Sequence, residues 1–415
     1  MFNQVYRYKW FADELIEGPL SPVLNDMAKI LFDRGHSRRK VRQQFVPLGQ
    51  LSRWMRKHHL SINQLNDEVV RKFLRAESRR VYSLTERGDT VTIKLLIRML
   101  MEKGLTSPPR RQANPKEKLF NEFESYMLSE KGMSPSAIYC YKRYSRLFVD
   151  HTFGGDNVKW RKINIDNIHK FVLHTSKSFS PTTNNLIVTC LRSFFRFLKM
   201  KGYVDFDWSA SVPNPPRWKS VNLPYYLNPQ DLEKLLAVVD RSTTIGKRNY
   251  AILLLLVGLG LRACEVAALS LDDLDWRNGE VILQGKGVRQ KRLPIPRDVG
   301  SALVEYIKCR HQDVKSRKIF LRSFPPYDGM ARGLVGVTVT GLIKRTKLKP
   351  FKSGSHLLRH TAATQMLKRG ASLNEIGMIL GHQSQFSTSI YAKVDFSNLL
   401  AVAQSWPLAE KGGGR

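Results

Sequence analysis

A histidine and an arginine on one predicted helix are the first residues whose types and spacing could do chemistry. They lie in SHLLRHTAATQMLKRG, residues 355–370, as His356 and Arg359, and His360 follows directly. Side chains three or four residues apart lie on neighbouring faces of a helix, so His356 and Arg359 can converge on one small anion. The leucines and alanines of this stretch supply its buried side. A lone HxxR pair is common by chance, so further residues are needed to identify a site.

Three other stretches carry polar residues where predicted elements begin or end. In GLRACEVAALSLDDLDW, Arg262 lies where the most apolar helix gives way to a polar one. In GEVILQGKGVRQKRLPIP, two apolar runs flank a Gly- and Lys-rich turn, which predicts a β-hairpin with Lys286 in the turn. In SLNEIGMILGHQS, Gly381 is a typical C-terminal cap and places His382 at the exit of a helix. Tyr391 follows in STSIY. Taken singly, each of these polar residues has an ordinary structural explanation.

The ordered set is more specific than any of its parts. An arginine after an apolar helix, a lysine in a hairpin turn, an HxxRH helix, a GH dipeptide and a tyrosine follow one another along the chain. Through GLRACEV, GKGVRQKRLPIP, HLLRHTAAT, LGHQS and SIYAKV the sequence resembles the tyrosine recombinase (phage integrase) family. The similarity covers nearly all of the segment that follows the proline-rich stretch at residues 211–224. The segment between that stretch and an earlier one at residues 106–115 resembles the family's helical core-binding domain. The first 105 residues lie outside the family's usual minimal architecture.

The resemblance implies metal-independent cleavage of a DNA phosphodiester. Such cleavage needs a nucleophile, a proton donor for the departing oxygen, and cations for the charge on the non-bridging oxygens. Carried over position by position, the resemblance makes Tyr391 the nucleophile, which forms a 3′-phosphotyrosyl link. Arg262 and Arg359 would clamp the phosphate, because a guanidinium donates two hydrogen bonds and stays charged. His382 would be a further donor to the phosphate, and Lys286 would protonate the leaving 5′-oxygen.

Two more residues are expected to support this chemistry. His356 would assist proton transfer with the tyrosine hydroxyl, because a free phenol has a pKa of ~10. Glu265, just past Arg262, is expected to buttress the site. Three other cations on the same hairpin could take the place of Lys286: Arg289, Lys291 and Arg292.

No cofactor is expected. The covalent link conserves the energy of the broken bond, so rejoining needs no nucleotide. The sequence has no GxxxxGK[ST] phosphate loop, since IGKRN at residues 245–249 carries an arginine where Ser or Thr is required. It also has no carboxylate cluster or HExxH motif for a two-metal or zinc nuclease.

The charge of the chain favours nucleic acid as its partner. Among 415 residues, 68 Lys and Arg stand against 35 Asp and Glu, a formal net charge of +33. Such a chain repels itself unless a polyanion shares the charge; an anionic membrane surface or charge for solubility are the alternatives. The most apolar run, residues 250–261, is too short to span a membrane and predicts a buried helix. Four scattered cysteines without a CxxC pair fit a reducing cytoplasm.

Two proline-rich stretches, residues 106–115 and 211–224, divide the chain. We expect a mainly α, multidomain DNA clamp whose catalytic domain holds a small antiparallel β-sheet or hairpin. A weak echo between RGHS at 34–37 and KGMS at 131–134 suggests that the first domain is a second core-binding-like DNA-binding domain, with a chance match as the alternative. The expected parts are an extra N-terminal helical domain (1–105), a helical core-binding, SAM-like domain (113–212), the catalytic domain (222–405) and a flexible tail (406–415).

These observations predict a site-specific recombinase that integrates, excises or transposes a mobile genetic element, because the extra N-terminal segment is unlike the family's short chromosome-dimer resolvases. The resemblance implies four active sites on two double-stranded DNA sites, hence a homo-tetramer or a hetero-tetramer with sibling recombinases. An amphipathic stretch at 396–408 would dock on a neighbouring protomer or pack on its own domain. The alternatives are type IB topoisomerase-like DNA relaxation and a non-catalytic DNA-binding accessory protein of the same fold.

Overall fold

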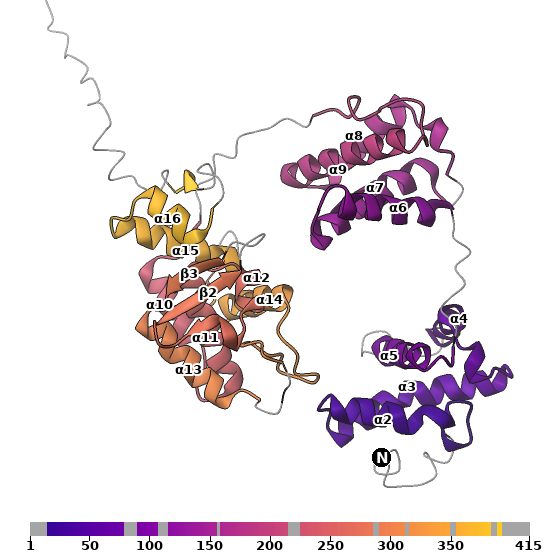
Figure 1. Ribbon diagram of the computed structural model, residues 1–415, viewed down its shortest axis with the longest axis horizontal. Coiled ribbons are helices and arrows are strands. Elements are labelled where there is room, and N and C mark those ends of the chain that lie inside the picture. Colours follow the sequence, from indigo (N-terminus) through magenta and orange to yellow (C-terminus); the bar gives the residue numbers. More distant parts are fainter. Residues whose placement is uncertain are drawn as a thin grey trace, which may run out of the picture. The chain divides into compact units, whose positions relative to one another are not determined.

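The computed structural model describes most of the chain, and its described part is largely helical with one three-stranded antiparallel sheet (Figure 1). This confirms the predicted fold class. Residues 63–72 and 100–221 form one compact unit, and the rest of the chain forms a second. Lys286 and the predicted tail lie outside the described residues. The described ranges are 15–78, 89–106, 115–155, 158–214, 225–284, 290–311, 314, 316–348, 354–382 and 388–391.

The helices before the first proline-rich stretch are amphipathic. Their longest member, α3, begins after Ser37, whose hydroxyl accepts a hydrogen bond from the amide of Lys40. One face of α3 buries Val41 and Phe45, while Arg38 and Arg39 are exposed. The elements are η2 (Ser21–Val23), α2 (Leu24–Asp33), α3 (Arg38–Lys57), η3 (Ile62–Gln64), α4 (Asp67–Ser78) and α5 (Asp89–Glu102).

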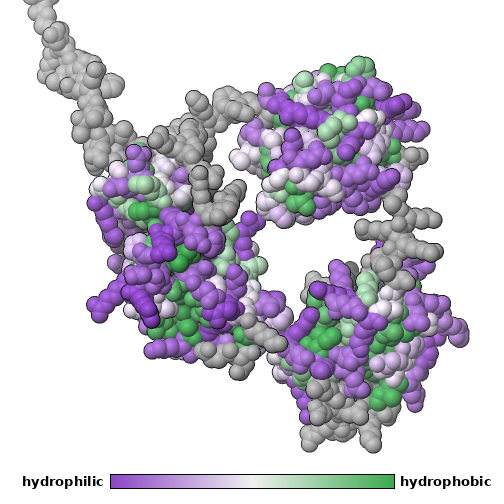
Figure 2. Space-filling model, viewed as in Figure 1, coloured by the Kyte–Doolittle hydropathy of each residue, from purple (hydrophilic) through white to green (hydrophobic). Residues whose placement is uncertain are grey.

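The second group of helices packs around an aromatic core. Ser180 caps α9 and Asn164 caps α8, as their sequences predict. Phenylalanine rings from α6 and α9 pack together, with Phe120 and Phe194 stacked at 5.6 Å. Hydrophilic residues cover most of the visible face of this group (Figure 2). The elements are α6 (Pro115–Ser129), α7 (Pro135–Phe153), η4 (Trp160–Lys162), α8 (Ile165–Ser178) and α9 (Pro181–Met200).

A buried helix organises the last part of the chain. Residues 251–257 of α11 are all buried, and α11 packs against α12, α13, α14 and α15. The apolar run is therefore a core helix, as predicted. Within the described ranges, no helix is both long and apolar enough to cross a membrane. The helices are α10 (Pro229–Ala237), α11 (Thr244–Gly258), α12 (Ala263–Ala268), η5 (Leu271–Asp273), α13 (Arg297–Cys309), α14 (Arg332–Arg345), α15 (Ser355–Lys368) and α16 (Leu373–Leu380).

The sheet contains the predicted hairpin and one strand that the sequence did not indicate. Strands β1 (Leu274–Asp275), β2 (Glu280–Gln284) and β3 (Gln290–Pro294) lie in that order, all antiparallel. Val281 of β2 pairs with Leu293 of β3, and both are buried, which follows the alternation of the sequence. Helix α13 begins at Arg297, shortly after β3 ends.

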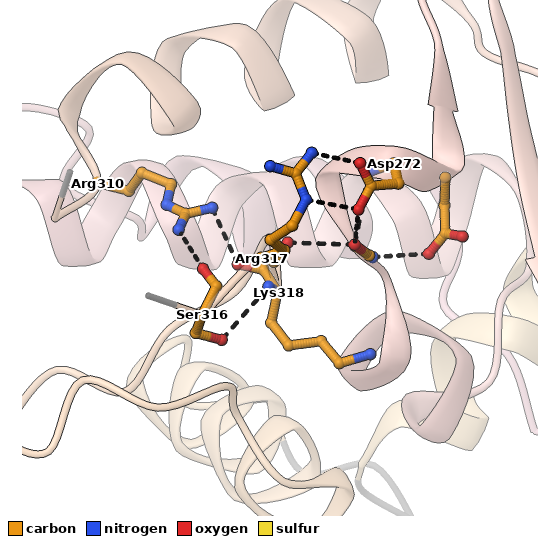
Figure 3. Close-up of polar contacts among 7 residues, drawn as sticks. Asp272, Arg310, Ser316, Arg317 and Lys318 are labelled. Atoms are coloured by element: carbon orange, nitrogen blue, oxygen red, sulfur yellow. Dashed lines mark hydrogen bonds and ion pairs between the residues drawn. The ribbon is translucent and has the colours of Figure 1, made fainter. Parts of the chain in front are cut away.

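Two arginines hold the segment that precedes α14: Arg310 reaches it from the end of α13, and Arg317 of the segment contacts Asp272 of η5 (Figure 3). Buried Arg310 donates to the carbonyl oxygens of Ser316 and Lys318, at 2.9 and 3.0 Å. Nε and Nη2 of Arg317 donate to the two carboxylate oxygens of Asp272. This contact holds the pKa of the Asp272 carboxyl below its ordinary value. The contact with Asp272 braces η5, which follows α12, the helix whose N-cap residue is Arg262.

Gly260 joins α11 to α12 with a left-handed backbone (φ +63°). A Cβ there would lie 2.5 Å from Cδ2 of buried Leu380. We expect Gly260→Ala to lower the free energy of unfolding by roughly 2–4 kcal/mol, because it adds a steric clash to backbone strain. Calorimetry of the full chain measures the shift.

Gly279→Ala is the matched control. Gly279 has a similar φ (+66°), but its added Cβ would meet no atom within 4 Å. It should therefore lose only the strain, about 1–2 kcal/mol. Equal losses in the two variants would show that packing against Leu380 does not constrain Gly260.

Candidate active site

The structure brings together Arg262, His356, Arg359, His382 and Tyr391, the five residues that the motifs single out among the described positions. Arg262 begins α12, His356 and Arg359 lie on α15, His382 follows α16, and Tyr391 lies close behind. His356, His382 and Tyr391 all interact electrostatically with both arginines. Residues far apart in sequence therefore share one cluster of charge.

Arg359 is the buried cation of the cluster, with 5% of its surface exposed. Its Nη1 donates to the carbonyl oxygen of Gly260 and its Nη2 to that of Leu380, each at 2.6 Å. Burial, and secondarily the charge of Arg262, lowers the pKa of Arg359 to about 10. The guanidinium therefore remains protonated at neutral pH and is fixed in orientation by two backbone groups.

Glu265, the residue expected to support the site, contacts Arg262 through both of its carboxylate oxygens. Its Oε1 accepts from Nη1 of Arg262 and its Oε2 from the backbone amide of Arg262, both at 2.7 Å. One carboxylate thus caps the first turn of α12 and orients the guanidinium. The other arm of the guanidinium, Nη2, donates to the carbonyl oxygen of Gly381 at 3.3 Å.

Three cationic side chains donate hydrogen bonds to three successive carbonyl groups at the C-terminal end of α16. Lys291 of β3 donates to Ile379, Arg359 to Leu380, and Arg262 to Gly381. Gly381 adopts the left-handed conformation (φ 63°) that ends the helix. The last carbonyls of a helix lack intrahelical partners and carry partial negative charge, so they attract cations. This arrangement preorganises three positive groups beside His382.

In the sequence analysis, Lys291 was only one of three cations that could take the place of Lys286. Its side chain is half-buried, and burial lowers its pKa to about 8, with Arg359 and Arg262 adding to the shift and Glu265 opposing it. The alternation along β3 could have indicated it, because Lys291 pairs across the hairpin with buried Leu283. Lys286, the predicted proton donor, lies outside the described residues.

The near-neutral pKa of Lys291 predicts a pH effect on cleavage. Below about pH 8 the ammonium is charged, and above it the charge is lost. We expect the cleavage rate at subsaturating DNA, which reports groups of the free enzyme, to fall above about pH 8. Lys291→Arg should remove this alkaline limb, because a guanidinium keeps its charge. Lys291→Met should slow cleavage about 10- to 100-fold, the value of a charged hydrogen bond.

Arg292→Met is the matched control for the Lys291 variants. Arg292 is the next residue of β3, is exposed, and pairs with Glu280 at 3.5 Å. Its loss removes one charge from the same strand without touching α16. An alkaline limb that persists in Lys291→Arg would assign the limb to another group.

The two histidines beside the arginines are shifted towards their neutral forms. Burial, followed by the charges of Arg359 and Arg262, lowers the pKa of His356 and brings that of His382 to about 4. Nδ1 of His382 lies 2.8 Å from Oγ1 of Thr388. When Thr388 donates to Nδ1, the proton of the neutral ring is on Nε2, which can then donate to an anion.

Tyr391 is buried beside these charges, with 1% of its surface exposed. It packs in a small apolar cluster with Ala363, Ile376 and Leu380. Burial raises the pKa of its hydroxyl, while Arg359 and Arg262 oppose the shift. Ionising this phenol near neutral pH therefore requires a proton acceptor.

The hydrogen-bond partner of the Tyr391 hydroxyl is His360, whose Nδ1 lies at 2.9 Å. His360 stood in the sequence motif without a role. Its place one turn after His356 could have drawn attention to it. Among the described residues, no group of three or more His, Cys, Asp or Glu could hold a metal ion.

Comparison with known proteins assigns the chain to a family. Residues 225–398 match the Phage integrase family, and residues 120–202 match the Phage integrase, N-terminal SAM-like domain. The protein named as integrase/recombinase y4rA of Sinorhizobium fredii (strain NBRC 101917 / NGR234) is 32% identical over 400 residues, which cover 94% of this chain and 95% of that protein. Tyrosine recombinase XerD of Listeria innocua serovar 6a is 30% identical over 286 residues, covering 66% and 94% respectively.

A solved structure agrees at the level of the fold. XerH site-specific recombinase bound to palindromic difH substrate, in a post-cleavage complex, superposes with a TM-score of 0.56 at 20% identity, over 81% of this chain and 94% of that one. The y4rA match covers 94% of this chain and therefore extends over most of the N-terminal segment. With an HxxRH helix, a helix-end histidine and a tyrosine assembled around two arginines, the chain belongs to the phage integrase family of tyrosine recombinases, enzymes that cleave and rejoin DNA strands.

Proposed function

We propose that Tyr391 is the nucleophile through which this recombinase cuts and rejoins DNA at specific sites. The observation that carries the proposal is the position of its hydroxyl, hydrogen-bonded to a histidine and within the electrostatic reach of Arg262 and Arg359. A tyrosine in a purely apolar core has no need of two neighbouring guanidinium groups.

A residue is assigned to each step of the cleavage. Oη of Tyr391 attacks the scissile phosphorus, an Oη–P bond forms, and the bond to the 5′-oxygen breaks. Arg262 and Arg359 neutralise the charge on the non-bridging oxygens, and His382 adds a hydrogen bond. Lys286 gives a proton to the leaving 5′-oxygen. His356 lies within the electrostatic reach of both arginines and would assist proton transfer with the tyrosine hydroxyl.

The proposed partner is double-stranded DNA, bound as a clamp between the helical domain or domains and the catalytic domain. The net charge of +33 supports it, and affinity should fall steeply with salt. Recombination between two duplexes needs four active sites, so the working form is a tetramer of identical or sibling subunits. The domain boundaries near residues 106–115 and 211–224 belong to this proposal, as does the cytoplasm as its compartment.

Integration, excision or transposition of a mobile element is the role we favour. The length shared with y4rA, named an integrase/recombinase, supports it, because that match extends over most of the N-terminal segment. The exposed basic face of α3 supports a DNA contact for this segment.

A covalent trap tests the proposal. The protein is incubated with supercoiled DNA that carries the sequences flanking its own gene, denatured rapidly, and the attached DNA is sequenced. We expect adducts clustered at a short site, with the protein on the 3′ side of the break. Adducts spread evenly over the DNA would support a relaxing topoisomerase instead. Binding without any adduct, under conditions where footprints are seen, would support an accessory protein.

A further inference from the structure

We propose that His360 is a catalytic residue of this recombinase, the base that accepts the phenolic proton of Tyr391. The inference rests on the proposed function of Tyr391 and extends it to a residue of the HxxRH motif that was given no role. Its main support is geometric: Nδ1 of His360 lies 2.9 Å from Oη of Tyr391. A general base must be within about 2.6–3.2 Å of the atom whose proton it takes.

The surroundings of the tyrosine make a base at this position necessary. Tyr391 has 1% of its surface exposed and is packed among apolar side chains of α15 and α16. Bulk water therefore cannot serve as the proton acceptor for a hydroxyl in this position. His360 is only partly buried, and its ring centroid lies 5.7 Å from that of Tyr391. It can take the proton at the hydroxyl and stands at the edge of the apolar cluster.

His360 and His356 have different partners in the site. Both are on α15, about one turn apart. The charges of Arg359 and Arg262 act on His356. Among the described residues, the hydrogen bond to the nucleophile's hydroxyl is made by His360. His360, rather than His356, is therefore the histidine placed to accept the proton of the nucleophile.

The step balances in protons and bonds. With the ring proton on Nε2, Nδ1 of His360 carries a lone pair that accepts the phenolic proton. The electron pair left on Oη forms the bond to phosphorus, and the bond from phosphorus to the 5′-oxygen breaks. That oxygen takes its proton from Lys286. In rejoining, the 5′-hydroxyl gives its proton back to Lys286 as its oxygen attacks phosphorus, the bond from phosphorus to Oη breaks, and His360 returns the proton to Oη.

The test compares His360→Asn with His360→Ala. The amide of asparagine can place an oxygen near the position of Nδ1, so it keeps a hydrogen-bond acceptor for Tyr391 but cannot take its proton. If His360 is the base, both variants should form the covalent adduct roughly 10²- to 10⁴-fold more slowly than the wild type. If His360 only positions the tyrosine, His360→Asn should retain most of the rate. Footprinting checks that DNA binding is retained.

A more acidic nucleophile separates the base role from a structural role. Fluorotyrosine is placed at position 391 by amber suppression, in the wild type and in His360→Asn. A fluorinated phenol loses its proton more easily, so it should narrow the rate deficit of His360→Asn by at least tenfold. A deficit that stays the same with fluorotyrosine would overturn the proposal, because a misplaced tyrosine is not repaired by acidity.

The remaining outcomes are also distinguishable. A wild-type protein that forms no adduct contradicts the proposed function itself. A wild type that forms adducts, together with His360 variants that cleave at the same rate, contradicts only the role of His360. Variants that cleave faster would show that the hydrogen bond restrains Tyr391 in the free protein, which also overturns the base assignment.

Discussion

Tyr391→Phe should abolish the covalent protein–DNA adduct while the protein still folds and binds DNA. The substitution removes one oxygen, and the ring can stay packed against Ala363, Ile376 and Leu380. The structural loss is the hydrogen bond with His360, a net of about 0.5–1.5 kcal/mol. The chemical loss is complete, because no phosphotyrosyl bond can form. Denaturing gel electrophoresis of protein with labelled DNA measures the adduct, and a gel-shift assay measures binding.

Tyr306→Phe is the control for losing a buried tyrosine hydroxyl. Tyr306 is 3% exposed on α13, and its hydroxyl accepts a hydrogen bond from the amide of Leu321 at 3.2 Å. This variant should lose a similar amount of stability and keep the adduct. An adduct that persists in Tyr391→Phe would show that another residue is the nucleophile.

Arg359→Lys should slow adduct formation by at least about 10²- to 10³-fold, the cost of removing one preorganised donor to developing charge. A lysine has a single ammonium group, which cannot span the carbonyls of Gly260 and Leu380 as the two arms of the guanidinium do. The end of α16, which precedes His382, would lose its link through Arg359 to the connection between α11 and α12 at Gly260. Single-turnover cleavage with saturating DNA measures the effect.

Arg248→Lys is the matched control for this substitution. Arg248 is also buried, at 6% exposed, and its Nη1 donates to the carbonyl of Leu321 and the hydroxyl of Ser323. It makes no contact with the site among those that the structure gives. It should cost stability and leave the cleavage rate nearly unchanged. Equal rate losses in the two variants would attribute the effect of Arg359→Lys to unfolding.

Local signals in the sequence were sufficient to place several helix ends and the hairpin. Capping residues such as Asn228, Ser180 and Gly381 act on the adjacent turn, so their roles can be read from a few neighbours. The alternation of β2 and β3 likewise depends on nearest neighbours across a short turn. The two-residue strand β1 was not indicated, because so short a segment has no periodicity of its own.

The sequence by itself determined which residue types are present and their order: two arginines, a histidine pair, a helix-end histidine and a tyrosine, each at the boundary or on one face of an element. Only the tertiary structure decided which of them touch. It placed His360 against Tyr391, and it placed Lys291 on the end of α16 beside both arginines. These contacts depend on how α12, α15, α16 and the hairpin pack, and long-range packing leaves no periodic trace in a single sequence.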